Sequence, residues 1–341
     1  MKKLLILVLF LILLTGCNKS NRIGEINVLN WSSYIPSEVI LDFESETGIK
    51  VNYSTYSSNE ELLAKVSSAK NGTYDLVFPS DYMIEIMISR NMLKELDKSK
   101  LSNYYHLNPT YLNLEYDVNN RYSLPFLAAS TVIAVNRDNI SDEINSYNDL
   151  LNEKYKNDIV LIDDQRIIIG MGLLANGYDM NSVNEEELEI AKNWLDSLKS
   201  NIKAYDSDSP KNFLISKEAN IAVLWNAEGA LASMENRSIE NIFPKEGVAL
   251  SVDNFAILKD SKNIENTYKF IDYILRPDVM KEIISSYPYK NVNRTTDSLL
   301  DDNYMSNRAS NLPNYVMENG SFVKNIGENI SLYDKIWISI K

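Results

Sequence analysis

I-N-V-L-N-W-S-S-Y, the stretch Ile26–Tyr34, shows the pattern around which this chain is organised. An apolar run typical of a buried strand ends in a tryptophan, two serines and a tyrosine, and Pro36 then favours the start of a helix. Three later stretches are built in the same way: Tyr74–Tyr82, Val160–Asp164 and Ile221–Glu228. Because ligands of open α/β sheets bind beyond the carboxyl ends of the strands, we expect these four ends to line one cleft.

Strands and helices alternate over most of the chain, which predicts an α/β fold with a largely parallel sheet. We expect strands at Ile26–Leu29, Lys50–Tyr56, Tyr74–Phe78, Tyr122–Pro125, Thr131–Asn136, Ile159–Ile162, Ile221–Leu224 and Phe255–Leu258. Later helices are expected at Arg166–Ala175, Glu185–Ser200, Ala227–Glu235, Thr267–Leu275 and Pro277–Ser285. A chain of 341 residues exceeds what one hydrophobic core usually organises, so we expect two α/β lobes.

Local signals predict the ends of the first helices. Gly48 is placed to cap the helix that follows Pro36, because glycine adopts the left-handed conformation at little cost. Ser58 and Glu61 have the spacing of a capping box, which predicts a helix running to Lys70.

The first residues have the pattern of an export signal rather than of a folded segment. Lys2 and Lys3 precede the apolar run Leu4–Leu14, which is too short to span a bilayer. The sequence L-T-G-C then resembles the bacterial lipoprotein signal, so we expect cleavage after residue 16, lipid attachment at Cys17 and a linker over residues 17–24. The alternative is an ordinary export signal with a chance cysteine. The lipoprotein signal predicts a chain that is exported to the periplasm or cell envelope and tethered to the membrane by lipid.

The composition disfavours several classes of partner. Without residues 1–16 the chain has 32 basic and 47 acidic residues, a net charge of −15, which argues against nucleic acid and anionic lipid headgroups. Cys17 is the only cysteine, so no disulfide is expected.

The motifs of the common cofactor and metal sites are also missing from the sequence. His106 is the only histidine, which rules out a multi-histidine metal site and leaves little for a catalytic triad. Gly170 and Gly172 loosely match a dinucleotide fingerprint, but the preceding strand already ends at Asp163 and Asp164, so we interpret these glycines as helix-packing residues. We expect neither a metal nor a cofactor.

Aromatic and acidic side chains gather at the strand ends. Trp31, Tyr34, Tyr82 and Trp225 offer ring faces, and Asp164, Glu228 and Asp253 offer negative charge. Ring faces attract alkylammonium groups, and carboxylates form charge-assisted hydrogen bonds with them. The set therefore predicts a site for a linear diamine or polyamine. The alternative is that each ring is an ordinary core residue.

Several segments resemble the substrate-binding proteins of spermidine/putrescine ABC importers. They are N-W-S-S-Y (Asn30–Tyr34), F-E-S-E-T-G-I-K-V (Phe43–Val51), S-T-Y-S-S-N-E (Ser54–Glu60), Y-D-L-V-F-P-S-D-Y (Tyr74–Tyr82), L-W-N (Leu224–Asn226), P-K-E-G (Pro244–Gly247) and L-R-P-D-V (Leu275–Val279). The resemblance covers essentially the whole mature chain. It implies a periplasmic-binding-protein-like fold of type II, a monomer whose two lobes close on a polyamine, and delivery to a membrane permease without any bond being made or broken.

The resemblance also implies a division of the chain and a set of ligand contacts. We expect residues 25–131 and 254–290 to form the first lobe, and residues 132–253 and 291–341 the second. The implied ligand-binding residues are Trp31, Ser32, Tyr34, Ser80, Asp81, Tyr82, Asp164, Trp225, Glu228, Asp253 and Tyr287. Glu228 falls where putrescine-preferring members of the family carry an acid.

The chain departs from the family pattern at four positions. Ile167 stands where the family usually has a glutamate, and Ser251 stands where it usually has a tryptophan. Val323 replaces a glutamine contact of spermidine binders, and Ser33 replaces an acid of putrescine binders. These changes leave open which polyamine is preferred.

Two other functions remain as alternatives. One is a binding protein for another organic cation or for an amino acid. The other is an envelope glycoside hydrolase that would use Asp164 and Glu228.

Overall fold

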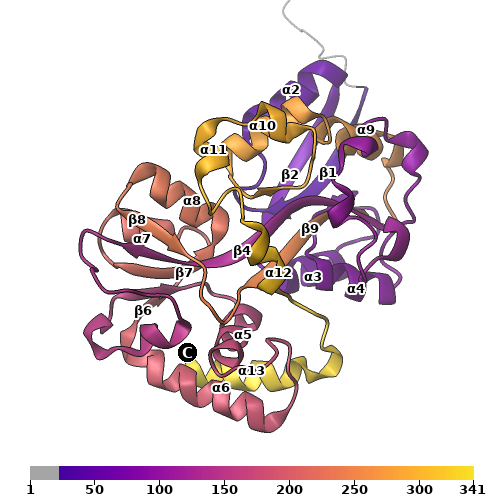
Figure 1. Cartoon of the computed structure of the whole chain (residues 1–341). Coiled ribbons are helices and arrows are strands. Elements are labelled where there is room, and N and C mark those ends of the chain that lie inside the picture. Colours follow the sequence, from indigo (N-terminus) through magenta and orange to yellow (C-terminus); the bar gives the residue numbers. More distant parts are fainter. Residues whose placement is uncertain (1–22) are drawn as a thin grey trace, which may run out of the picture.

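Two α/β lobes make up the computed structural model, which describes residues 23–341. Figure 1 shows the first lobe at the upper right and the second at the lower left, with strands β4 and β9 running between them. The expected signal segment, residues 1–16, and the expected lipidation site Cys17 lie outside the described residues.

The first lobe is built on three parallel strands that begin the fold. They are β1 (Gly24–Trp31), β2 (Ile49–Tyr56) and β3 (Leu76–Val77), and their helices are α2 (Ser37–Thr47), α3 (Asn59–Ser68) and α4 (Asp81–Ser89). The lobe is completed by α9 (Ile264–Ile274), α10 (Pro277–Ser286) and β10 (Lys290–Asn291). The third strand is shorter than the expected Tyr74–Phe78, and the carboxylate of Asp75, just before it, accepts hydrogen bonds from Asn27 and Asn263.

The predicted ends of the first helices can be compared residue by residue. Gly48 caps α2 at φ 70°, and its N–H donates to Glu44, so the predicted cap is confirmed. The Ser58 hydroxyl accepts from the Glu61 amide at 3.1 Å, as in a capping box. The reciprocal bond differs from the prediction, because the Glu61 carboxylate accepts from Ser57 at 2.7 Å. The helix also ends at Ser68, before Lys70.

One long strand, β4 (Ser123–Asn136), carries the chain from the first lobe into the second. Its first half pairs antiparallel with β9 (Ala249–Ile257), and its second half pairs with β7 (Ile221–Trp225) and β8 (Ile239–Ile242). The sequence predicted two separate strands here, which was wrong. Every residue of β4 is buried, so the run lacks the polar alternation that marks a continuous strand.

The second lobe repeats the α/β arrangement around parallel strands. The strands are β5 (Ile159–Leu161), β6 (Ile202–Tyr205), β7 (Ile221–Trp225) and β8 (Ile239–Ile242), and the helices are α5 (Gln165–Ala175), α6 (Glu185–Leu198), α7 (Lys211–Ile215), α8 (Asn226–Glu235) and α13 (Ile330–Ile340). Helix α11 (Asp302–Ser306) packs on the first lobe through Tyr304, and α12 (Asn314–Asn319) and β11 (Ser321–Phe322) follow it; β11 pairs with β9.

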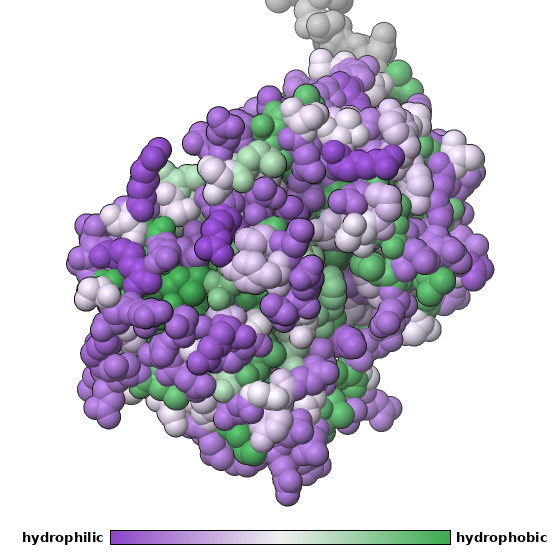
Figure 2. Space-filling model, viewed as in Figure 1, coloured by the Kyte–Doolittle hydropathy of each residue, from purple (hydrophilic) through white to green (hydrophobic). Residues whose placement is uncertain are grey.

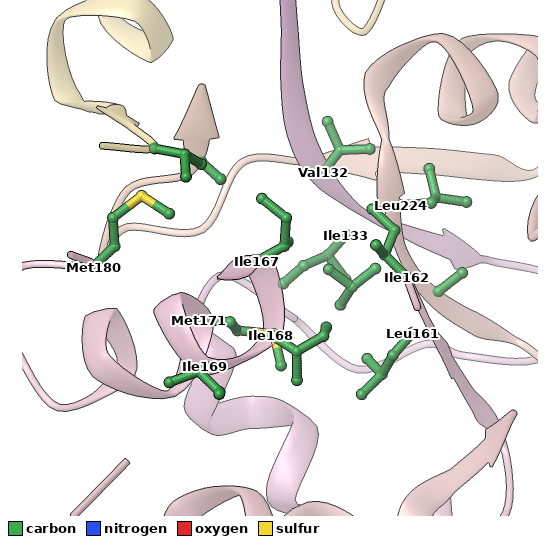
Figure 3. Packing of buried hydrophobic residues seen from close by; sticks show 14 of the residues in the cluster. Val132, Ile133, Leu161, Ile162, Ile167, Ile168, Ile169, Met171, Met180 and Leu224 are labelled. Atoms are coloured by element: carbon green, nitrogen blue, oxygen red, sulfur yellow. The ribbon is translucent and has the colours of Figure 1, made fainter. Parts of the chain in front are cut away.

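Helix α5 is buried on all sides and forms the centre of the second core. Figure 3 shows Ile167 and Ile168 on the side of the helix that faces Ile133, Leu161 and Ile162, whereas Ile169 points away from these residues. A side chain at Gly172 would meet the Ala191 carbonyl of α6 at 3.1 Å, so the interpretation of this glycine as a packing residue is confirmed.

The chain after α10 contacts both lobes. Val292 packs in the first core, and the Asn293 amide donates to the Leu275 carbonyl, whereas Tyr333 of α13 packs in the second core. Tyr304 of α11 also packs in the first core, whereas Asn307 donates to Ser233 of α8, so we propose a boundary near residue 306 in place of the expected 290. The face shown in Figure 2 is largely polar with scattered apolar patches. No helix within residues 23–341 has the length and apolarity to cross a membrane.

Candidate binding cleft

A cavity of about 80 Å³ lies where the strands of the two lobes end. Eight of the residues selected from the sequence line it: Trp31, Ser32, Tyr34, Ser80, Tyr82, Asp164, Trp225 and Asp253. The lining also contains residues that sequence reasoning did not select as contacts: Ser57, Asn59, Ala129, Ile162, Asp163, Arg166, Ile167, Ser207, Asp208, Ser251, Tyr289 and Val323. We call this cavity the interlobe cleft.

Asp253 lies at the bottom of the interlobe cleft and is only 4% exposed. It sits on β9, next to the turn that follows β3, so two hydroxyl groups reach its carboxylate. Tyr34 donates to one oxygen at 2.5 Å, and Ser80 donates to the other at 2.6 Å. Burial raises the pKa of Asp253 from 3.8 to about 6, and the bonds from Ser80 and Tyr34 oppose that rise.

Aromatic rings form the first-lobe wall of the cleft. The Trp31 indole N–H donates to the Phe78 carbonyl at 2.9 Å, which holds the ring in one orientation. Its centroid lies 6.2 Å from that of Tyr34, and Tyr34 in turn lies 4.8 Å from Tyr289. The rings therefore form one continuous surface beside Asp253.

Tyr289, rather than Tyr287, lines the interlobe cleft. The sequence S-Y-P-Y places two tyrosines on either side of Pro288, and residues two apart in extended chain share a face. The local sequence therefore points to both tyrosines. It does not indicate that Tyr289, next to β10, is the one whose ring packs on Tyr34. Tyr287 instead packs against the core of the first lobe.

Asp164 enters the cleft from the second lobe at the start of α5. One of its oxygens, Oδ1, accepts from the backbone amides of Arg166 and Ile167, at 2.8 and 3.1 Å. Within residues 23–341 no hydrogen bond reaches the other oxygen, Oδ2. Burial raises the pKa of Asp164, and the two amide bonds oppose this. Its neighbour Asp163 is exposed and pairs with Lys341.

Arg166 is a cleft residue that sequence reasoning missed. Its side chain is 3% exposed and donates to the Lys324 carbonyl at 3.0 Å and to Asn181 at 2.9 Å. Its guanidinium carbon lies 5.9 Å from the centroid of the Tyr82 ring, on the opposite lobe. An arginine inside the otherwise apolar run Q-R-I-I-I-G was the available signal, since a buried charge needs specific partners.

Three of the selected residues lie outside the lining of the interlobe cleft. The Asp81 carboxylate accepts from the Tyr82 amide at 2.9 Å, and it borders an adjoining cavity of about 730 Å³ that shares Tyr82 and Val323 with the cleft. Glu228 forms an ion pair with Lys211, and Tyr287 packs in the first lobe as described.

The positions that depart from the family pattern are also placed by the structure. Ile167, Ser251 and Val323 line the cleft, so each replacement changes its surface directly. Ser33 is exposed at φ 56°, a left-handed conformation at the tip of the turn after β1.

The charges around the cleft favour a cationic ligand. The carboxylates of Asp164, Asp208 and Asp253 line it against the guanidinium of Arg166, while that of Asp163, also in the lining, is paired with Lys341. Among residues 23–341 no group of three or more histidine, cysteine, aspartate or glutamate side chains is arranged to hold a metal ion. Rings and separated carboxylates are the groups that bind alkylammonium ions.

Comparisons with known proteins agree with this geometry. Residues 38–311 match the family described as bacterial extracellular solute-binding protein. The spermidine/putrescine-binding periplasmic protein of Salmonella typhimurium is 36% identical over 313 residues, which cover 92% of this chain and 90% of that protein. A putrescine-binding periplasmic protein of Escherichia coli is 31% identical, covering 81% of this chain and 80% of its own. The solved structure of a putative spermidine/putrescine ABC transporter from Listeria monocytogenes superposes with a TM-score of 0.89, at 32% identity, over 93% of this chain and 98% of that one.

Proposed function

The chain belongs to the bacterial extracellular solute-binding protein family, and we propose that it binds a polyamine between its lobes and delivers it to an ABC importer. The observation that carries the proposal is Asp253, a buried carboxylate held by Tyr34 and Ser80 beside a wall of aromatic rings. Named relatives that bind spermidine, putrescine or both support the same ligand class.

We propose that the eight selected residues that line the cleft contact the ligand, together with Tyr289. In this arrangement Asp253 and Asp164 bind ammonium groups, while the rings of Trp31 and Trp225 cover the methylene chain. Cation–π contacts of this kind are each worth roughly 0.5–2 kcal/mol, depending on how far the cation is desolvated. Closure of the lobes would remove water and so strengthen these contacts.

Titration calorimetry with putrescine, spermidine, spermine and arginine tests the ligand class. We expect saturable binding of at least one polyamine, and weak or absent binding of arginine. Binding of arginine alone would overturn the polyamine proposal and favour the amino-acid alternative.

The glycoside hydrolase alternative needs Asp164 and Glu228 to face the same sugar. Glu228 is paired with Lys211 outside the lining, and Asp164 caps a helix, so the geometry gives this reading no support. We therefore do not favour an enzymatic function.

Tethering by lipid is part of the proposal. The sequence L-T-G-C at Leu14–Cys17 supports lipid attachment at Cys17, and periplasmic relatives support a location in the envelope. In cells fed a labelled fatty acid, we expect label on the wild-type chain and none on Cys17→Ala. Equal labelling of the two chains would contradict the anchor.

A further inference from the structure

Asp208 is a carboxylate of the interlobe cleft that the ligand contacts proposed above leave unused. It lines the cleft, and its side chain is exposed. Within residues 23–341 its carboxylate takes part in no hydrogen bond and no ion pair. Lys211, three residues later, is not available to it, because that lysine pairs with Glu228 at 3.0 Å. Asp208 therefore brings to the cleft a negative charge that is free to meet a ligand.

The loop that carries Asp208 is fixed by bonds to its neighbours. The Asp206 amide donates to the Leu161 carbonyl at 2.9 Å, which continues the pairing of β6 with β5. The Ser207 hydroxyl accepts from the Asp163 amide at 3.0 Å. The Asp206 carboxylate accepts from the Asp208 amide at 2.8 Å. The backbone of Asp208 is thus held in place before a ligand arrives, which reduces the entropy lost on binding.

The order of the strands places Asp208 at the outer end of the cleft. Strands β7, β5 and β6 are neighbours in that order and run parallel, so their carboxyl ends lie at one edge of the sheet. Trp225 ends β7, Asp164 lies three residues beyond β5, and Asp208 lies three residues beyond β6. Neighbouring strands are about 4.8 Å apart, so Asp208 follows Asp164 by about one strand spacing, on the side away from Trp225. Asp253 of β9 lies at the opposite end of this order.

We infer that Asp208 is a specificity-determining residue that binds the outer ammonium group of a triamine. This inference rests on the proposed function, in which Asp253 and Asp164 bind the two ammonium groups of a diamine. A longer linear polyamine that extends beyond Asp164 meets the carboxylate of Asp208 next. The neighbouring lining residue Ile167 has no charge with which to bind this amine instead. A triamine therefore gains a contact that a diamine leaves unused.

Calorimetric titration of Asp208→Asn with spermidine and putrescine tests the inference. Asparagine keeps the size of the side chain and removes its charge, and the position is exposed and outside regular secondary structure, so the fold should be retained. We expect the affinity for spermidine to fall about fivefold, while the affinity for putrescine stays within about twofold of the wild type. Equal losses for the two ligands, or an unchanged affinity for spermidine, would overturn the inference.

Glu218→Gln is the matched control. This glutamate is exposed in the loop after α7 and lies outside the lining of the cleft, so it tests the loss of one negative charge from the same lobe. Both affinities should stay within about twofold of the wild type. A loss of spermidine binding as large as that of Asp208→Asn would show a general charge effect and refute a contact at Asp208.

The salt dependence of binding is a second readout, which a change in loop structure would not produce. At about 1 M salt, exposed charges are screened beyond about 3 Å, so the difference in spermidine affinity between the wild type and Asp208→Asn should shrink to within about twofold. A difference that persists undiminished would assign the effect to loop structure and count against the inference. Absence of polyamine binding by the wild type would instead refute the proposed function, so the two failures are distinct.

Discussion

Asp253 carries two properties that follow from its burial between Tyr34 and Ser80. Both of its oxygens already accept hydroxyl hydrogen bonds, so the carboxylate is held in one orientation before a ligand arrives. Such preorganisation reduces the entropy lost on binding. The same burial makes the ionised form costly, and a cation is the partner that offsets this cost.

Replacement of Asp253 by asparagine should weaken binding of a diamine by at least tenfold, or about 1.4 kcal/mol. The change removes the charge and keeps the size of the side chain, so the binding free energy that is lost is that of the charge-assisted contact with the ligand amine. Calorimetry on both proteins at pH 7 measures it. An unchanged affinity would remove Asp253 from the set of ligand contacts.

The affinity should also depend on pH in the range where Asp253 titrates. Its pKa of about 6 lies above the ordinary value of 3.8, so the folded chain binds this proton more tightly than the unfolded chain. This group's stabilisation of the fold is therefore full below pH 3.8 and is lost as the pH rises through 6.

Ligand binding has the opposite dependence, because an ammonium requires the ionised carboxylate. About a tenth of Asp253 is ionised at pH 5, so the affinity at pH 5 should be about tenfold lower than at pH 7. Asp253→Asn is the control, because the part of the pH dependence that this residue causes should vanish in it. An identical pH profile in both proteins would assign the titration to another carboxyl, such as Asp164, whose pKa is also raised.

At the scale of secondary structure, the residue that caps the start of α5, Asp164, also lines the interlobe cleft. Asp164 caps the helix with one oxygen, while its other oxygen has no partner within residues 23–341. The arrangement makes one side chain serve both the helix terminus and the cleft. It also places a carboxylate at the positive end of the helix dipole, where negative charge is stabilised.

Two substitutions separate these roles of Asp164. Asparagine keeps a capping oxygen, so Asp164→Asn should leave the free energy of unfolding almost unchanged while weakening polyamine binding. Alanine removes the cap as well, so Asp164→Ala should lose about 1 kcal/mol of stability in addition. Denaturant unfolding and calorimetry measure the two effects. Equal stability in both variants would show that the cap contributes nothing.

At the scale of the whole molecule, the lobes are joined by the crossing strands β4 and β9, and side chains of the two lobes also meet beside the cleft. Arg166 of the second lobe faces the Tyr82 ring of the first, and Asn325 donates to Glu85 of α4 at 3.3 Å. In two-lobed folds, closure around a ligand takes place at a few connecting segments, and we expect β4 and β9 to be those segments here. A ligand that bridges Asp253 and Asp164 would favour the closed arrangement.

Small-angle scattering tests this closure. We expect the radius of gyration to fall when a saturating polyamine is added to the wild-type chain. Asp253→Asn at the same ligand concentration should show a smaller fall, because less of it is bound. A radius that stays constant while calorimetry shows saturation would mean that binding does not require lobe movement.

Much of this arrangement could be read from the sequence, because the signals are local. Gly48 ends its helix, the strand at Ile221 ends in Trp225, and apolar runs end in rings and carboxylates whatever surrounds them. The single strand β4 was missed, because a run buried on both faces carries no alternating pattern.

The sequence by itself therefore determined the two α/β lobes, the strand ends that meet and the cationic class of ligand. Tertiary structure alone decided which neighbouring side chain faces the cleft: Tyr289 lines it, and Tyr287 does not. It alone paired Lys211 with Glu228, and it alone buried the Arg166 guanidinium near the rings of Tyr82 and Tyr333. The physical reason is that local sequence sets backbone conformation, whereas the partner of a charge or ring depends on segments distant in the chain that meet only after folding.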